Sequence, residues 1–179
     1  KKQIAKEITE TLERVANKPK SYTYITFEEV AYLLLYGALP TREQLTSFHA
    51  NLVKRRELPA ALRTVLELIP KDAHPMDVLR TAVSALAGFD PATYDNSVEA
   101  TRDKGIRLAS QVPMIVAAHE AIRNGRPVPE PDMSLSHAAN FLWMITGRKP
   151  SAEGAQLMDR DLILHAEHGS NADRKSTRL

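Results

Sequence analysis

Apolar residues recur along most of the chain at intervals of three or four positions, which is the spacing of one face of an α-helix. Near the N-terminal end such a stripe runs over residues 4–15, and Pro19 ends it. The stretch SYTYI at residues 21–25 alternates instead, and it predicts either a small strand or an extended lead-in. The pattern therefore predicts a mainly helical chain.

Residues typical of helix starts and helix ends mark the limits of the next two expected helices. In TFEEVAYLLLYGALPT, Thr26 and Glu29 have the spacing of a capping box, and Gly37 supplies a left-handed stop. Thr41 and Gln44 repeat the capping arrangement at the start of the following helix. Both helices are thus predicted from residues only a few positions apart.

Proline and glycine mark the ends of the helices expected further along. One helix is predicted over 59–69, and another begins near Pro75 and ends at Gly88. A longer helical stretch spans about 97–124, and Pro113 within it should kink or split the helix. SHAANFLWMITG and SAEGAQLMDRDLILHAEH predict two further helices. Together these elements predict an all-α fold.

Composition narrows the class of protein. The 179 residues suffice for one domain with a substantial core, and 43% hydrophobic and 26% charged residues are ordinary for a globular protein. The absence of cysteine excludes disulfides and thiol catalysis and fits a cytoplasmic location. A net charge of +2 does not favour nucleic acid as a partner. No apolar run approaches the roughly 18 residues of a membrane span, so we expect no membrane partner.

Two histidines stand out near the C-terminal end. His165 and His168 are three positions apart and share a helix face, with Glu167 between them. They lack the HExxH order of a zinc site, so we expect no metal. The pair can be a polar helix end, or a histidine that binds an anion, because a carboxylate ligand keeps an imidazole protonated near neutral pH.

The remaining polar signals predict structural roles. His74 precedes a helix-starting proline and suits a capping or packing role. The basic clusters VKRRELP and IRNGRP are expected to be solvated faces. The other histidines are expected to be solvated or structural: His49, His119 and His137.

Four stretches carry a resemblance to a known family. TFEEVAYLLLYGALPT, HPMDVLRTAVSAL, SHAANFLWMITGRKPS and LILHAEHGSNA occur in that order over residues 27–172. Each resembles a stretch of the citrate synthase family, which includes the 2-methylcitrate synthases. The resemblance implies a mostly helical homodimer with a large and a small domain in each subunit.

The resemblance also implies a reaction and one ligand residue. The family are acyltransferases that condense oxaloacetate, or a related oxoacid, with acetyl-CoA or propionyl-CoA, without a permanently bound cofactor. The second histidine of the HxxH stretch contacts the oxoacid, and that position is His168 here. Asn171 matches a polar position of the same stretch, to which we assign no role.

The catalytic set of the family does not occur in this sequence. Two histidines in motifs resembling PxHGG and GxGHxxY, and a later aspartate, have no counterpart here, so no catalytic residue is assigned. The residues that bind coenzyme A also stay unknown. We therefore expect a fragment of a citrate synthase that is itself inactive. The alternatives are a 2-methylcitrate synthase fragment and a non-catalytic helical interaction module.

Three segments are expected. Residues 1–25 form a helical lead-in of uncertain origin, and residues 26–172 form part of a citrate synthase large domain. Residues 173–179, DRKSTRL, resemble the translation of a sequencing-library adapter and are predicted to be non-native. The alternative for this last segment is an ordinary basic tail.

Overall fold

The structure of the chain is a computed structural model that describes residues 25–166. Several expectations fall outside these residues: the helix over 4–15, the role of His168, and the nature of residues 173–179. They stay predictions.

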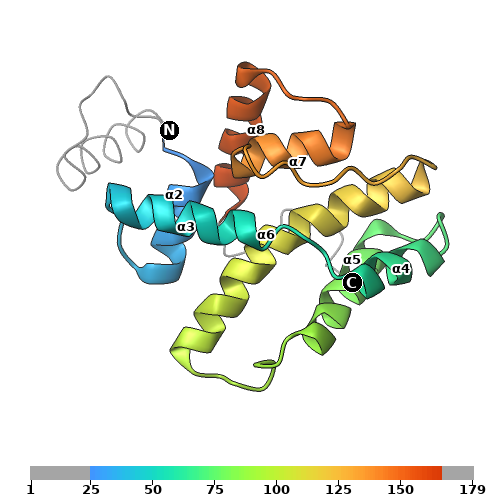
Figure 1. The fold of residues 1–179 in the computed structure, drawn as a ribbon, viewed down its shortest axis with the longest axis horizontal. Coiled ribbons are helices and arrows are strands. Elements are labelled where there is room, and N and C mark those ends of the chain that lie inside the picture. The colour runs from blue at the N-terminus through green and yellow to red at the C-terminus, as the bar shows by residue number, and fades with distance from the viewer. Residues whose placement is uncertain (1–24, 167–179) are drawn as a thin grey trace, which may run out of the picture. The chain divides into compact units, whose positions relative to one another are not determined.

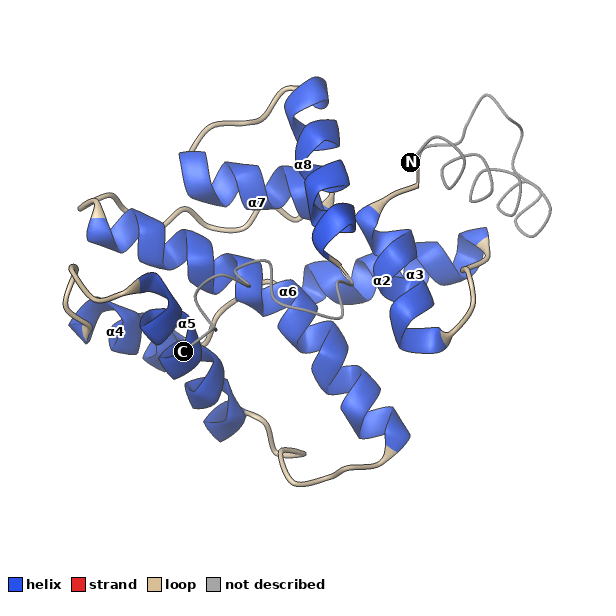
Figure 2. Ribbon diagram, turned by 180° about the vertical axis from the view of Figure 1, so that it is seen from behind, coloured by secondary structure: helices blue, strands red, loops and turns tan. Residues whose placement is uncertain are grey.

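The described residues are helical, and no strand occurs within 25–166. Figures 1 and 2 show helices joined by loops throughout. The all-α prediction is therefore confirmed. The helices are α2 (Phe27–Tyr36), α3 (Arg42–Lys54), α4 (Ala60–Leu68), α5 (Pro75–Leu86), η2 (Ala87–Phe89, a 3-10 turn), α6 (Val98–Arg123), α7 (His137–Thr146) and α8 (Ala152–His165).

The chain divides into two compact units. One unit holds Lys1–Phe48 and Asp159–Leu179, and the other holds His49–Met158. The first therefore contains α2 and the C-terminal half of α8, and the second contains α4 to α7.

The expected capping boxes are present at the first two described helices. Thr26 Oγ1 accepts the Glu29 amide at 3.3 Å, and Glu29 Oε2 accepts the Thr26 amide at 2.9 Å. Thr41 and Gln44 make the same reciprocal pair at 3.2 and 2.8 Å. Gly37 ends α2 with φ of 77°, a conformation that costs glycine little because it has no Cβ.

The start of α5 agrees with the sequence, and its end does not. His74 is the N-cap, and its Nδ1 accepts the Met76 amide at 3.3 Å. The expectation that Gly88 ends the helix was wrong, because α5 ends at Leu86 and continues as η2. The backbone at Ala87 stays right-handed, so the last turn tightens without needing a left-handed residue.

Pro113 bends α6 without splitting it. The helix is continuous over 26 residues, and Figures 1 and 2 show its two halves running in different directions. The expected kink is confirmed, and a split is not observed. The turn after the proline is buried at Met114, Ile115, Ala117 and Ala118. Burial of this turn helps compensate for the backbone hydrogen bond that a proline cannot donate.

The core of the second unit lies where α6 packs against α4, α5 and α7. These side chains are buried at helical spacing, as the sequence pattern predicts. The core comprises Leu58, Leu62, Leu66, Val78, Ala82, Leu86, Met114, Ile115, Ala117, Ala118 and Met144.

The cluster VKRRELP is not a solvated face, which corrects the expectation. Arg56 is 1% exposed, and its guanidinium donates to the carbonyls of Asp132 at 2.7 Å and Leu135 at 2.9 Å. Arg55 forms a two-bond ion pair with Asp103 at 2.9 and 2.5 Å. Because a guanidinium can donate to two acceptors at once, both arginines make paired hydrogen bonds within the protein.

Arg56 belongs to a set of side chains that holds the connector between α6 and α7. The connector carries three prolines and has no regular structure over residues 126–136. Asn140 Oδ1 accepts the Asp132 amide at 2.9 Å, and Trp143 Nε1 donates to the Glu130 carbonyl at 2.8 Å. Arg126 of the second basic cluster donates to a carbonyl at the end of α7. Side chains of α7, of the segment before α4 and of the connector itself therefore supply hydrogen bonds to this prolyl segment.

Candidate functional site

The C-terminal end of α8 is where the sequence places the expected oxoacid ligand. His165 is the last residue of the helix, and its side chain is 55% exposed. Its Nδ1 lies 2.8 Å from the Asp161 carbonyl and 3.8 Å from Asp161 Oδ1. The imidazole of His165 is therefore accessible to solvent at the end of the helix. The structure thus places the first histidine of the pair, and His168 lies outside the described residues.

Asp159 is a polar residue of α8 that the sequence reasoning missed. It is 5% exposed, and its Oδ1 accepts the amide of Phe27 at 3.1 Å, within the same unit. The sequence offered one sign of this burial: Asp159 lies on the same helix face as Ala155 and Leu162, and apolar residues are usual on such a face. A carboxylate at such a position needs a buried donor.

Two of the histidines expected to be solvated or structural are buried. His137 is 2% exposed and His119 is 8% exposed, so neither side chain is solvated. Within the described residues His119 Nε2 has no hydrogen-bond partner. Burial lowers the pKa of His119 below its usual value, and the nearby Arg123 lowers it further.

The His119 side chain borders an apolar cavity of about 440 Å³ in the second unit. The walls come from α5, α6 and α7, and the rim includes Met76, which is 57% exposed. The polar groups at this cavity are His119, Glu120 and Arg123. It lacks the convergent cations that a dicarboxylate needs.

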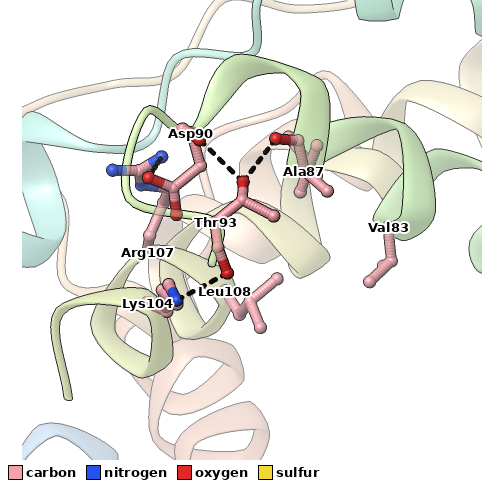
Figure 3. Close-up of a pocket in the computed structure, with 8 residues that line it drawn as sticks. Val83, Ala87, Asp90, Thr93, Lys104, Arg107 and Leu108 are labelled. Atoms are coloured by element: carbon pink, nitrogen blue, oxygen red, sulfur yellow. Dashed lines mark hydrogen bonds and ion pairs between the residues drawn. The ribbon is translucent and has the colours of Figure 1, made fainter. Parts of the chain in front are cut away.

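A second pocket lies between α5 and α6, and Figure 3 shows its lining residues. Its two positively charged side chains contact the loop that follows η2. Lys104 Nζ donates to the Thr93 carbonyl at 2.9 Å, and Arg107 lies 3.4 Å from Asp90 Oδ1. Thr93 Oγ1 also donates within this loop. These two side chains therefore hold the loop that follows η2 against α6.

No group of three or more potential metal-ligating side chains gathers within residues 25–166. The helices of this part of the chain also include none that is long and apolar enough to cross a bilayer.

The sequence matches the profile of a known family over nearly its whole length. The family is described as "Citrate synthase, C-terminal domain", and the match covers residues 8–179.

The relatives carry two enzyme names, citrate synthase and 2-methylcitrate synthase. The chain is 44% identical over 147 residues to the citrate synthase of Deinococcus radiodurans, covering 82% of this chain and 39% of that protein. It is 41% identical over 159 residues to the 2-methylcitrate synthase 1 of Corynebacterium glutamicum, covering 86% and 42%. The chain therefore spans about two fifths of the length of these relatives.

Solved structures agree with the sequence matches. The citrate synthase of Pyrobaculum aerophilum superposes with a TM-score of 0.77 at 34% identity, covering 89% of this chain and 40% of that one. The citrate synthase of Thermotoga maritima gives a TM-score of 0.69 at 34% identity, covering 90% and 39%. The helical fold of the described residues and these matches lead to one conclusion: the chain belongs to the citrate synthase family.

Proposed function

We propose that this chain is the oxoacid-binding portion of a citrate synthase, which condenses oxaloacetate with acetyl-CoA to give citrate and CoA. The observation that carries the proposal is the HxxH sequence that begins at His165, the last residue of α8, in a chain of this family. The relatives at 44% and 42% identity are both named citrate synthase.

His168 is the proposed ligand of the oxoacid. A protonated imidazole pairs with a carboxylate of oxaloacetate and can polarise the adjacent ketone, which is the electrophile of the condensation. The bound dianion in turn favours the protonated imidazole. The role is that of a binding residue, since proton transfer from the acyl thioester needs a separate base.

The acid-base steps are proposed to lie outside these 179 residues. Neither PxHGG nor GxGHxxY occurs in the sequence, and no aspartate here matches the family's catalytic segment. Without a base to remove a proton from the acyl α-carbon, no carbon–carbon bond forms. The chain by itself is therefore proposed to bind the oxoacid without turning it over.

Acetyl-CoA and propionyl-CoA differ by one methylene group in the acyl chain, so discrimination between them depends on how the pocket accommodates that group. Such a group is worth only about 1–3 kcal/mol of discrimination in an apolar pocket. Relatives of both names resemble the chain to a similar degree, at 44% and 41% identity. A 2-methylcitrate synthase is thus the second candidate. The homodimer and the cytoplasmic location remain proposals carried by the family resemblance and the cysteine-free composition.

A non-catalytic helical interaction module is the alternative from a different class. It predicts no response of the His168 imidazole to oxaloacetate, whereas the proposed function requires one.

The experiment is a titration of the 179-residue chain with oxaloacetate, followed by NMR signals of the histidine imidazoles. H165Q and H168Q assign the two signals. We expect the His168 signal to move on binding, its pKa to rise, and H168Q to abolish saturable binding. H165Q is the matched control and should retain binding. A wild-type chain with no saturable change at His168 contradicts the proposal, and so does citrate formation by this chain alone.

A further inference from the structure

The C-terminal end of α6 holds an asparagine followed by a glycine. Asn124 is the C-cap of the helix, and Gly125 has φ of 66°, in the left-handed region where glycine is favoured. The amide of Gly125 donates to the Ile122 carbonyl at 3.0 Å, and that of Arg126 donates to the Ala121 carbonyl at 2.9 Å. A left-handed residue after the last turn allows such bonds to the final carbonyls of a helix. The helix end therefore gives the Asn124–Gly125 pair a structural role.

The side chain of Asn124 is bonded to the preceding turn of the same helix. Its Nδ2 donates to the Glu120 carbonyl at 2.8 Å and to Glu120 Oε1 at 2.7 Å. The second bond has a charged acceptor, and such bonds are shorter and stronger than neutral ones. Asn124 and Gly125 are nonetheless exposed. The two bonds thus hold the side-chain amide against α6, while water has access to it.

An exposed asparagine before a glycine is open to a spontaneous reaction. Asparagine is a thermolabile residue, and glycine has no Cβ to hinder the approach of its own nitrogen. After the Gly125 amide has lost its proton to solvent, the nitrogen attacks Asn124 Cγ. The N–Cγ bond forms, the Cγ–Nδ2 bond breaks, and Nδ2 leaves as ammonia with a proton from water. Water then opens the cyclic imide, and residue 124 becomes aspartate or isoaspartate.

The native hydrogen bonds oppose ring closure at both reacting groups. The proton that Gly125 must lose is donated to the Ile122 carbonyl, and the amino group that must leave is bonded to Glu120. The reaction therefore requires the last turn of α6 to open. Such local opening costs less free energy at the end of an element than in the core, so the folded chain slows the reaction without abolishing it.

The products would disrupt the bonding at this helix end. A carboxylate at position 124 cannot donate to the two Glu120 oxygens, and it places a second negative charge beside the Glu120 carboxylate. It also lies at the negative end of the α6 dipole. Isoaspartate in addition lengthens the backbone by one carbon atom, which displaces the amides of Gly125 and Arg126 from their acceptors.

We propose that Asn124–Gly125 is a modification site of this protein, at which spontaneous deamidation, restrained by Glu120, releases the C-terminal end of α6. The effect reaches the connector that follows, because the Arg126 guanidinium donates to the Ile145 carbonyl of α7 at 3.1 Å. All of these residues belong to the second unit. The proposal is independent of oxoacid binding.

The first test is peptide mapping by mass spectrometry after incubation at mildly alkaline pH. We expect a mass gain of one unit at residue 124, at least about tenfold more slowly in the folded chain than in guanidinium chloride. Glu120→Ala removes the side-chain acceptor and should react about fivefold faster than wild type when folded, but equally fast in denaturant. Glu99→Ala is the matched control, because it removes an exposed carboxylate from the other end of α6, and it should react like wild type.

The second test follows the consequence of the reaction by hydrogen exchange. Asn124→Asp has the side chain of one product, whereas Asn124→Gln keeps an amide that closes a five-membered imide no longer. The aspartate variant should speed exchange of the Gly125 and Arg126 amides about tenfold relative to wild type, and the glutamine variant should change it less. This pair decides the matter if Glu120→Ala does not fold.

Three outcomes would overturn the proposal. No mass change at residue 124 in denaturant would mean that the pair is not a modification site. Equal rates in the folded and denatured chains, or equal rates in folded Glu120→Ala and wild type, would remove the restraining role of the helix end. Wild-type exchange in Asn124→Asp would show that the product does not release α6.

Discussion

Arg56→Lys separates the charge of Arg56 from its ability to reach two acceptors. The guanidinium bridges the carbonyls of Asp132 and Leu135 from a position with 1% exposure. A lysine keeps the positive charge but presents a single nitrogen, which cannot hold both carbonyls in the same geometry.

The structure sets the size of the expected loss. A hydrogen bond from a charged donor contributes about 1.5–3 kcal/mol, and leaving a buried acceptor unsatisfied costs a similar amount. Losing one of the two bonds should therefore lower the free energy of unfolding by about 2–3 kcal/mol. For a chain of this size that corresponds to a fall in Tm of roughly 4–12 °C.

Arg63→Lys is the matched control, because Arg63 holds the same connector from the surface. It pairs with Glu130 at 2.7 and 3.0 Å, and the Glu130 side chain is 71% exposed. An exposed pair contributes about 0.2–1 kcal/mol, so this variant should lose far less stability than Arg56→Lys. The Glu130 pKa, which the bond from Arg63 lowers, should stay low in the lysine variant.

The assay is urea unfolding followed by far-ultraviolet circular dichroism, with hydrogen exchange of residues 126–136 as a local measurement. Arg56→Lys should lower the midpoint and speed exchange in this connector first. Equal losses in the two lysine variants, or a loss below about 0.5 kcal/mol for Arg56→Lys, would refute the reasoning, because a surface change has that size.

Two further predictions concern single side chains of the described residues. Burial lowers the pKa of His119, so the folded state favours the neutral imidazole. The contribution of His119 to the free energy of unfolding is therefore present above pH about 6.5. It is lost as the pH falls below that value. His119→Gln should flatten the pH dependence of unfolding in that interval, and an unchanged slope would contradict the assignment. Gly37→Ala should cost about 1 kcal/mol, since alanine disfavours a positive φ and an added Cβ at Gly37 meets nothing within 4 Å. Gly88→Ala also meets nothing and has no positive φ, so it should not destabilise; equal costs in thermal unfolding would mean that backbone conformation does not explain the effect.

The sequence identified one part of the candidate site, namely the two histidines of the HxxH stretch. The sequence singled out His165 and His168, and the structure places the first of them, exposed at the end of α8. It did not single out Asp159, which is one acid among many in an exposed-looking helix. Neither did it distinguish Arg56 from its neighbour Arg55 within one basic run.

Helix identity and most helix ends were determined by the sequence itself. Thr26 with Glu29, Thr41 with Gln44, and Gly37 act on amides and carbonyls within a single turn, so short spacings in the chain encode them.

Only the tertiary structure decided which polar side chains are buried and what they bond. Arg56 bonds carbonyls 76 and 79 positions away, and Asp159 bonds an amide 132 positions away. The continuity of α6 through Pro113 likewise coincides with burial of the following turn in the core. The physical reason is range: a cap satisfies backbone groups a few residues away, whereas a buried charge is stable only where the fold brings a distant partner to it.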